Sequence, residues 1–340
     1  MKISIIIPVY NCKEYLPACV DSIRAVGVEA YEILLIDDGS TDGSGALCDD
    51  LAAQYSEIRV IHQPNSGASA ARNRGIREAV GENVLFLDAD DSIDPEALGA
   101  VLADPRCNQA DLVIFGLTFD YYHHGSCYRR DPLYFEQEGI LTKTDWCAAF
   151  EELFLRNSLS PVWNKVYKRD ILLRHRLELN EKMFLYEDFE FVLRYMQHCG
   201  KIINIPKAIY HYRQTEDEGN AGRRLRRIES IPVFLKHIEE ALEGLKSVPA
   251  EQKSNVLLTL HQGLARGKIA VSDLAGTRRI CREYAQWYRN RKMTVGQNEF
   301  HQQLTEGKAV SLLLQSKKTA LRHKIAVRVK SFLLKLTETG

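Results

Sequence analysis

The sequence lacks the cysteine patterns of metal-binding domains and of disulfide-stapled domains. None of its eight cysteines is spaced as C-x-x-C or adjoins another cysteine; they stand at positions 12, 19, 48, 107, 127, 147, 199 and 281. Scattered thiols in a chain of 340 residues are typical of a reducing compartment. We therefore expect a cytoplasmic protein.

Long apolar runs and an excess of charge of one sign are also absent. No stretch approaches the roughly 20 apolar residues that cross a bilayer. The run that begins at Ile3 is too short for a signal peptide and ends at Tyr10 and Asn11 without a small-residue cleavage site. Lys plus Arg and Asp plus Glu balance at 45 each, so the whole-chain charge does not favour a nucleic-acid partner.

What is present is an alternation of apolar, β-branched runs with segments of helical periodicity. It predicts strands and helices in turn, the strands at 3–9, 32–36, 58–62 and 83–87 and the helices at 13–26, 43–55 and 67–80. This order is typical of an α/β protein with a doubly wound, mostly parallel sheet. Further on we expect strands at 111–116 and 201–212, and helices at 144–156, at 188–199 and from about 222 onward.

The change of pattern along the chain suggests three parts. Residues 1–105 form the first half of the α/β domain, 106–215 its second half, and 216–340 a helical C-terminal region. No low-complexity linker marks these boundaries.

Acidic and polar residues follow three of the predicted strands, at 8–11, 37–42 and 88–91. Because ligands of such sheets bind at the carboxyl ends of the strands, we expect these loops to form a site. Asp88 and Asp90 are suited to share Mg²⁺ or Mn²⁺ with a diphosphate. The alternative is an acidic turn that caps the next helix, for which Asp94 and Pro95 are the better candidates.

Each of the other candidate residues also has a structural alternative. Asp38 can accept a hydrogen bond from a nucleobase or belong to a turn. Arg72 follows a small-residue loop that can approach an anion, or lies on a packed helix. Asp188 is either an N-cap or a general base. Basic and amide groups recur at 163–165 and 211–213, where they either contact phosphate or are structural.

Taken together, these segments resemble family 2 glycosyltransferases, which have the GT-A fold. The resemblance covers about residues 1–215 and rests on 5–11, 36–42, 65–73, 87–91, 163–165 and 186–188. It implies a site in which Pro8, Val9, Tyr10 and Asp38 lie at the nucleobase and Arg72 lies near the nucleotide. Asp88 would lie at the ribose with Ala89 beside it, and Asp90 at the metal. Asp188 would be the catalytic base, and His211 and Arg213 would lie over the diphosphate.

The implied reaction moves a sugar, with inversion, from a nucleotide-diphosphate donor to a hydroxyl of a glycan or lipid-linked acceptor. A UDP-sugar is the expected donor, and cell-surface or exopolysaccharide synthesis the expected process. Two alternatives are a decayed module that serves as a binding protein and a sugar-phosphate nucleotidyltransferase. The second would need a glycine-rich basic loop after the first strand, where Pro8 to Asn11 stand instead.

The C-terminal segment 317–336 has an apolar helical stripe flanked by Lys and Arg. Such a helix can lie on an anionic membrane surface. The alternative is a helix packed on the enzyme or on a second subunit, as in a homo-oligomer. We expect peripheral contact with the inner face of the cell membrane.

Overall fold

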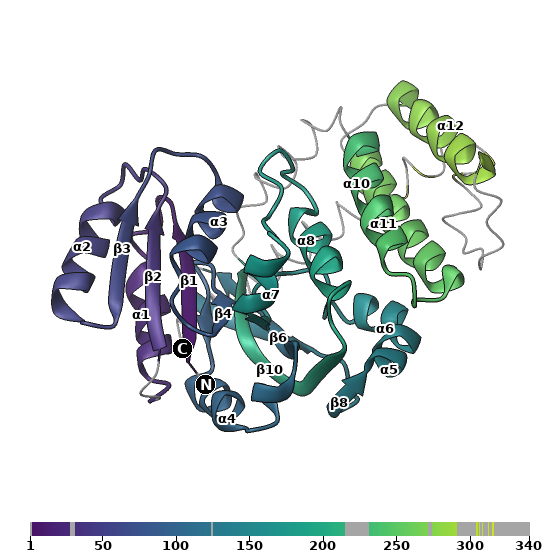
Figure 1. The fold of residues 1–340 in the computed structure, drawn as a ribbon. Helices are drawn as coiled ribbons and strands as arrows, with labels where there is room; N and C mark the ends of the chain where they lie inside the picture. The colour runs from purple at the N-terminus through teal and green to yellow at the C-terminus, as the bar shows by residue number, and fades with distance from the viewer. Residues whose placement is uncertain are drawn as a thin grey trace, which may run out of the picture. The chain divides into compact units, whose positions relative to one another are not determined.

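The computed structural model describes most of the chain up to Asn290 and five single residues beyond it. The described ranges are 2–27, 31–123, 125–214, 231–270 and 274–290, and the single residues are Leu304, Glu306, Lys308, Leu312 and Gln315. Figure 1 shows the arrangement of helices and strands. The segment 317–336 lies outside the described residues.

Ten strands of the described chain form one sheet in the order β3-β2-β1-β4-β9-β6-β10-β5, with β7 beside β6 and β8 beside β10. Its first four strands are parallel, as predicted, and Figure 1 shows them side by side. They are β1 (Ile3–Val9), β2 (Tyr31–Asp37), β3 (Ile58–His62) and β4 (Asn83–Phe86).

The second half of the sheet is mixed. The strand β9 (Lys165–Lys168) runs antiparallel to β4 and to β6 (Leu112–His123), whereas β10 (Lys201–Gln214) is parallel to β6. The remaining strands, β5 (Ser92–Ile93), β7 (Ser126–Leu133) and β8 (Gly139–Thr142), pair antiparallel with their neighbours. The sheet is therefore continuous from the predicted parallel half into the second half.

Helices flank the parallel strands at nearly the predicted positions. They are α1 (Leu16–Arg24), α2 (Ser44–Gln54), α3 (Ala68–Glu78) and α4 (Pro95–Ala103). The order of the strands reverses between β1 and β4, and right-handed connections then put α3 on the opposite face from α1 and α2. Asp94 caps α4, since its Oδ1 accepts a hydrogen bond from Ala97 N at 2.8 Å, which confirms the predicted cap.

The helix expected at 144–156 is two short helices, and the one expected at 188–199 begins one residue earlier. The structure has α5 (Lys143–Ala148), α6 (Phe150–Leu155), α7 (Arg169–Arg174), α8 (Glu187–Met196) and a 3₁₀ turn at Cys107–Gln109. Thr142 and Asp145 form a capping box that starts α5.

Contacts divide the chain into two compact units. The first unit contains the sheet up to Gln214 and also Pro232–Pro249, which forms most of α10 (Ile231–Gly244). Within this unit α10 contacts residues that flank α8: Gln197 Nε2 donates to Ala241 O at 3.0 Å, and the rings of Phe184 and Phe234 meet edge to face at 4.8 Å. The helix α10 therefore supports the helix that carries Asp188.

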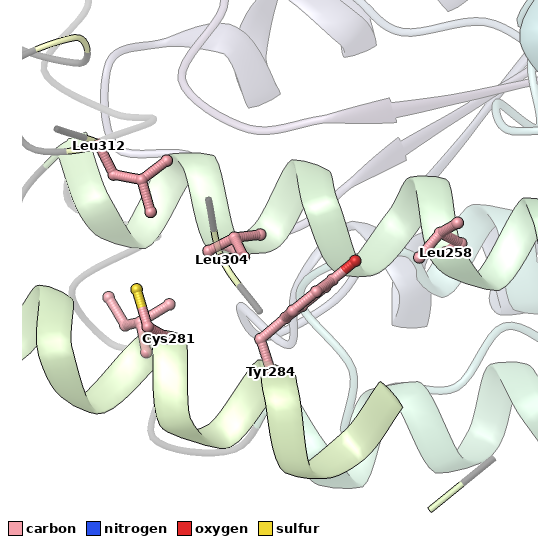
Figure 2. Packing of buried hydrophobic residues seen from close by; sticks show 7 residues of the cluster. Leu258, Cys281, Tyr284, Leu304 and Leu312 are labelled. Atoms are coloured by element: carbon pink, nitrogen blue, oxygen red, sulfur yellow. The ribbon is translucent and has the colours of Figure 1, made fainter. Parts of the chain in front are cut away.

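The second unit contains α11 (Ala250–Ala270) and α12 (Leu274–Asn290). Its own small core, part of which is shown in Figure 2, includes Leu258, Tyr284 and Leu304. None of the helices in the described ranges combines the length and hydrophobicity needed to cross a membrane.

Candidate active site

The loops that follow β1, β2 and β4 meet at one edge of the sheet, as expected. They meet because these strands are neighbours and parallel. Val9 O accepts a hydrogen bond from Asp38 N at 2.9 Å, and Asn11 Oδ1 accepts one from Thr41 N at 2.8 Å. The Val9 side chain is buried in the core, Pro8 is partly buried, and Tyr10 is 52% exposed beside this edge.

Asp38 organises the loop that leads into α3. Its carboxylate accepts hydrogen bonds from Gln63 Nε2 at 2.8 Å, from Ser66 N at 2.8 Å and from Gly67 N at 2.7 Å. A carboxylate offers about four lone-pair sites, so three are already in use. The sequence pattern showed the carboxylate but not these three donors. A contact from Asp38 to a nucleobase stays a prediction.

Arg72 joins two candidate carboxylates from different parts of the chain. Its Nη2 donates to Asp88 Oδ1 at 2.6 Å, and its Nη1 lies 3.5 Å from Asp188 Oδ1. Burial alone would lower the pKa of the Arg72 guanidinium, but the charges of Asp88 and Asp188 outweigh burial and raise it. Arg72 is therefore a fixed cation between the loop after β4 and the start of α8.

The packing of α3 on β1 places Arg72 there. A Cβ at Gly75 would lie 2.3 Å from Ile6 Cγ2, so only glycine allows this close approach. The helix thus lies deep enough for the Arg72 side chain to be 6% exposed.

Replacing Arg72 with Met should lower the free energy of unfolding by about 3 kcal/mol, because it leaves two desolvated carboxylates without their cation. Urea unfolding followed by circular dichroism measures the change. The matched control is Arg74→Met on the same helix, whose exposed pair with Glu78 should contribute less than about 1 kcal/mol. Equal unfolding midpoints for the two variants would contradict the bridging role of Arg72.

Asp188 is not the N-cap of α8, so that alternative is wrong. The helix begins at Glu187 and its N-cap is Tyr186, whose backbone is left-handed at φ 62°. Asp188 instead lies in the first turn with its side chain 23% exposed, and its Oδ1 accepts no hydrogen bond. Burial raises the Asp188 pKa, Arg72 acts against this, and Asp88 adds to it.

Lys165, from the stretch 163–165, is fully buried. Its Nζ donates to Pro161 O and to Asn164 Oδ1, both at 2.6 Å. Burial lowers the pKa of this ammonium well below its usual range, and Asp188 partly opposes the effect. Since Lys165 cannot reach a phosphate from the core, its structural interpretation is the one supported.

The end of β10 lies beside the acidic loop after β4. Arg213 N donates to Asp91 Oδ1 at 2.7 Å, and Arg213 Nε donates to Asp90 O at 3.0 Å. Tyr210 OH also donates to Asp91 Oδ2 at 2.6 Å, so Asp91, the last residue of the acidic loop 88–91, holds the two segments together. His211 and Arg213 are thus brought next to Asp90, and a contact of either residue with the diphosphate stays a prediction.

A small pocket lies at this junction. It is lined by Asp90, Asp91, Ser92, Asp120, Tyr122, His211 and Arg213. The guanidinium of Arg213 stacks over the Tyr122 ring, 3.8 Å from its centroid. Asp120 and Tyr122 escaped sequence reasoning because the stretch around them has the composition of an irregular hairpin, whereas β6 extends to His123.

Asp90 lines this pocket, and Asp88 precedes it in the chain with the buried Ala89 between them. Burial raises the pKa of Asp90, and the charge of Asp88 raises it further. The carboxylate of Asp90 has no hydrogen bond to another side chain in the described ranges. Within the described ranges of the chain, no group of three or more His, Cys, Asp and Glu side chains is arranged to hold a metal ion.

Residues 4–158 match the family model described as glycosyl transferase family 2. An uncharacterised glycosyltransferase of Bacillus subtilis, EpsJ, is 29% identical over 71% of this chain and 68% of its own length. Another from Escherichia coli, YibD, is 30% identical over 62% of this chain and 61% of its own length. The chain thus spans about two thirds or less of the length of these relatives.

Among solved structures, that of S. aureus TarS in complex with UDP-GlcNAc has a TM-score of 0.68 at 19% identity and covers 95% of this chain and 92% of that one. This likeness confirms the α/β fold expected from the resemblance. The matched segment includes the loops after β1, β2 and β4 and extends through the β6–β7 hairpin. By this match the segment 4–158 of the chain resembles glycosyl transferase family 2.

Proposed function

We propose that this chain transfers a sugar, with inversion, from a nucleotide-diphosphate donor to a hydroxyl of a glycan or lipid-linked acceptor. The observation that carries the proposal is the bridge by Arg72 from Asp88 to Asp188. It sets a carboxylate suited to proton abstraction close to Asp88, which with Asp90 forms the D-x-D motif at 88–90. The UDP-GlcNAc bound to the similar TarS fold supports a UDP-sugar as the donor.

Asp188 would act as the base for the acceptor hydroxyl. A carboxylate abstracts a proton efficiently when its pKa is raised toward the working pH, and burial raises that of Asp188. Arg72 holds the carboxylate in place and favours its ionised form. With the base on one face of the sugar and the leaving group on the other, a single displacement inverts the anomeric carbon.

Asp88 and Asp90 fit a divalent cation. Their ligand atoms are oxygens, which Mg²⁺ and Mn²⁺ prefer. Burial and, after it, the charge of Asp88 raise the Asp90 pKa, so a bound cation would stabilise the ionised carboxylate. Such a metal, when bound, supplies Lewis-acid stabilisation of the departing diphosphate. His211 and Arg213 lie beside Asp90 and would offset the remaining charge of the diphosphate. The nucleobase would lie near Pro8, Val9, Tyr10 and Asp38.

The proposed biological role is cell-surface or exopolysaccharide synthesis at the cytoplasmic side of the membrane. Peripheral membrane contact through 317–336 and a homo-oligomeric state belong to the same proposal and are predictions from the sequence. A decayed binding module is the competing function, and it differs by having no turnover.

A donor screen tests the proposal. The full chain should hydrolyse one of the common UDP-sugars slowly in the presence of Mn²⁺ or Mg²⁺, because water replaces the acceptor, and EDTA should stop the reaction. Release of UDP, measured by a coupled assay, reports the turnover. UDP-, GDP- and dTDP-sugars tested in parallel identify the donor. If none is turned over and UDP itself does not bind, the decayed-module alternative is supported instead.

A further inference from the structure

A buried carboxylate lies behind His211 on the neighbouring strand. Asp120 is on β6, which pairs parallel with β10 in the register Thr118 to His211 and Asp120 to Arg213. Its side chain is 4% exposed. The Oδ2 atom of Asp120 lies 3.0 Å from His211 Nδ1, which places a negative charge directly against the imidazole.

Asp120 is held by two further donors. Thr118 Oγ1 donates to Asp120 Oδ1 at 3.0 Å, and Arg130 Nε donates to Oδ2 at 3.2 Å from the opposite strand β7. Arg130 is 62% exposed, so it does not need Asp120 for its own solvation. A carboxylate that is buried and held from three sides has one orientation, and its partners are ordered with it.

This contact decides which ring nitrogen of His211 remains for a ligand. A carboxylate only accepts, so Nδ1 carries a proton and donates it to Asp120. The other nitrogen, Nε2, has no hydrogen-bond partner among the described residues, and the ring lines the small pocket beside Asp90. Nε2 is therefore the nitrogen left for a ligand. In the imidazolium form, which carries a hydrogen on each nitrogen, Nε2–H can donate to an anion while the negative charge of Asp120 lies against the positive ring.

We propose that Asp120 is a positioning residue that holds His211 for the diphosphate group of the donor. The inference rests on the proposed function, in which His211 lies at the diphosphate. Asp120 itself does not touch the donor. Its effect should therefore be confined to ligands that carry the second phosphate, whereas a residue that only stabilises the β6–β7 hairpin would affect all ligands alike.

The test compares the binding of UDP and UMP, in the presence of Mn²⁺, to the full chain by isothermal titration calorimetry. Asp120→Asn keeps the shape of the side chain but removes its charge and lets the imidazole adopt either tautomer. We expect UDP to bind about tenfold more weakly, the lower end of the loss seen when the partner that orients a metal-binding histidine is replaced. Binding of UMP should change by less than about twofold, and Asp120→Glu should restore part of the preference for UDP.

Asp131→Asn is the matched control, because Asp131 lies on the same hairpin and pairs with the exposed Arg129. It should leave both ligands unaffected. His211→Ala should reproduce the loss of UDP binding, and the double variant with Asp120→Asn should lose no more than His211→Ala alone.

Two results would overturn the inference. In the first, His211→Ala selectively weakens the binding of UDP, whereas Asp120→Asn weakens the binding of UDP and UMP equally or of neither. The inference then fails and the proposed function stands. If His211→Ala leaves the preference for UDP unchanged, or the unaltered chain does not bind UDP, the role of His211 at the diphosphate fails, and the role of Asp120 fails with it.

Discussion

Replacement of Asp188 by Asn should lower the rate of sugar transfer by about 10² to 10⁴, the usual contribution of a general base. The amide keeps the shape of the side chain in the first turn of α8 but cannot accept the proton of the acceptor hydroxyl. The affinity for the donor should barely change, since the D-x-D carboxylates are intact. Single-turnover assays with saturating donor and acceptor measure this rate.

The stability of the Asp188→Asn protein should be close to that of the unaltered chain. Asp188 is a desolvated carboxyl whose pKa is raised, so its ionised form is not a source of folding energy above that pKa. Its loss leaves Arg72 paired with Asp88. An unchanged melting temperature therefore separates lost chemistry from lost structure.

The pH dependence provides a second readout. As the pH falls, Asp188 takes up a proton and can no longer act as a base. Because its pKa is raised, transfer should decline at a higher pH than the value of about 3.9 of an ordinary Asp would give. Glu187→Gln is the control, at the neighbouring position. If sugar transfer is slow in the Glu187→Gln variant and unchanged in the Asp188→Asn variant, Glu187 is the base.

Replacement of Asp90 by Asn should remove nearly all transfer and most of the metal-dependent binding of a nucleoside diphosphate. Its carboxylate is the one at this junction without a hydrogen bond to another side chain in the described ranges, and it lies next to Asp88 and Arg213. Calorimetric titration of UDP with and without Mn²⁺ measures the metal-dependent part. Treatment of the unaltered chain with EDTA should have the same effect.

Asp94→Asn is the matched control for this variant. Asp94 lies four residues further on and caps α4, and Asn caps about as well as Asp. The control should retain transfer and metal-dependent binding. Full activity of Asp90→Asn, or of the unaltered chain in EDTA, would exclude the metal-dependent mechanism.

Local features of the chain could be predicted because their causes are local. The β-branched run of β1 and the alternation of strands with helices result from hydrophobic periodicity, which neighbouring residues determine. The gathering of the loops at 8–11, 37–42 and 88–91 follows from the parallel order of strands that such an alternation favours. The cap at Asp94 is similarly encoded by Asp94 and Pro95 themselves.

The roles of individual side chains depended on contacts between distant parts of the chain. Asp188 could be taken for a cap because periodicity locates the first residue of α8 only to within a few residues. In the structure the N-cap of α8 is Tyr186. Likewise, the pattern around Asp38 shows a carboxylate but not the three donors that already occupy it.

The sequence by itself therefore determined the order of the elements, the family motifs and the edge of the sheet at which they lie. The tertiary structure alone decided which charges face one another. Arg72 meets Asp188 across 116 positions of chain, and Asp120 meets His211 across 91, through the packing of α3 on β1 and the pairing of β6 with β10. No local pattern encodes such meetings, because they depend on the register of strands and the depth of helices in the whole domain.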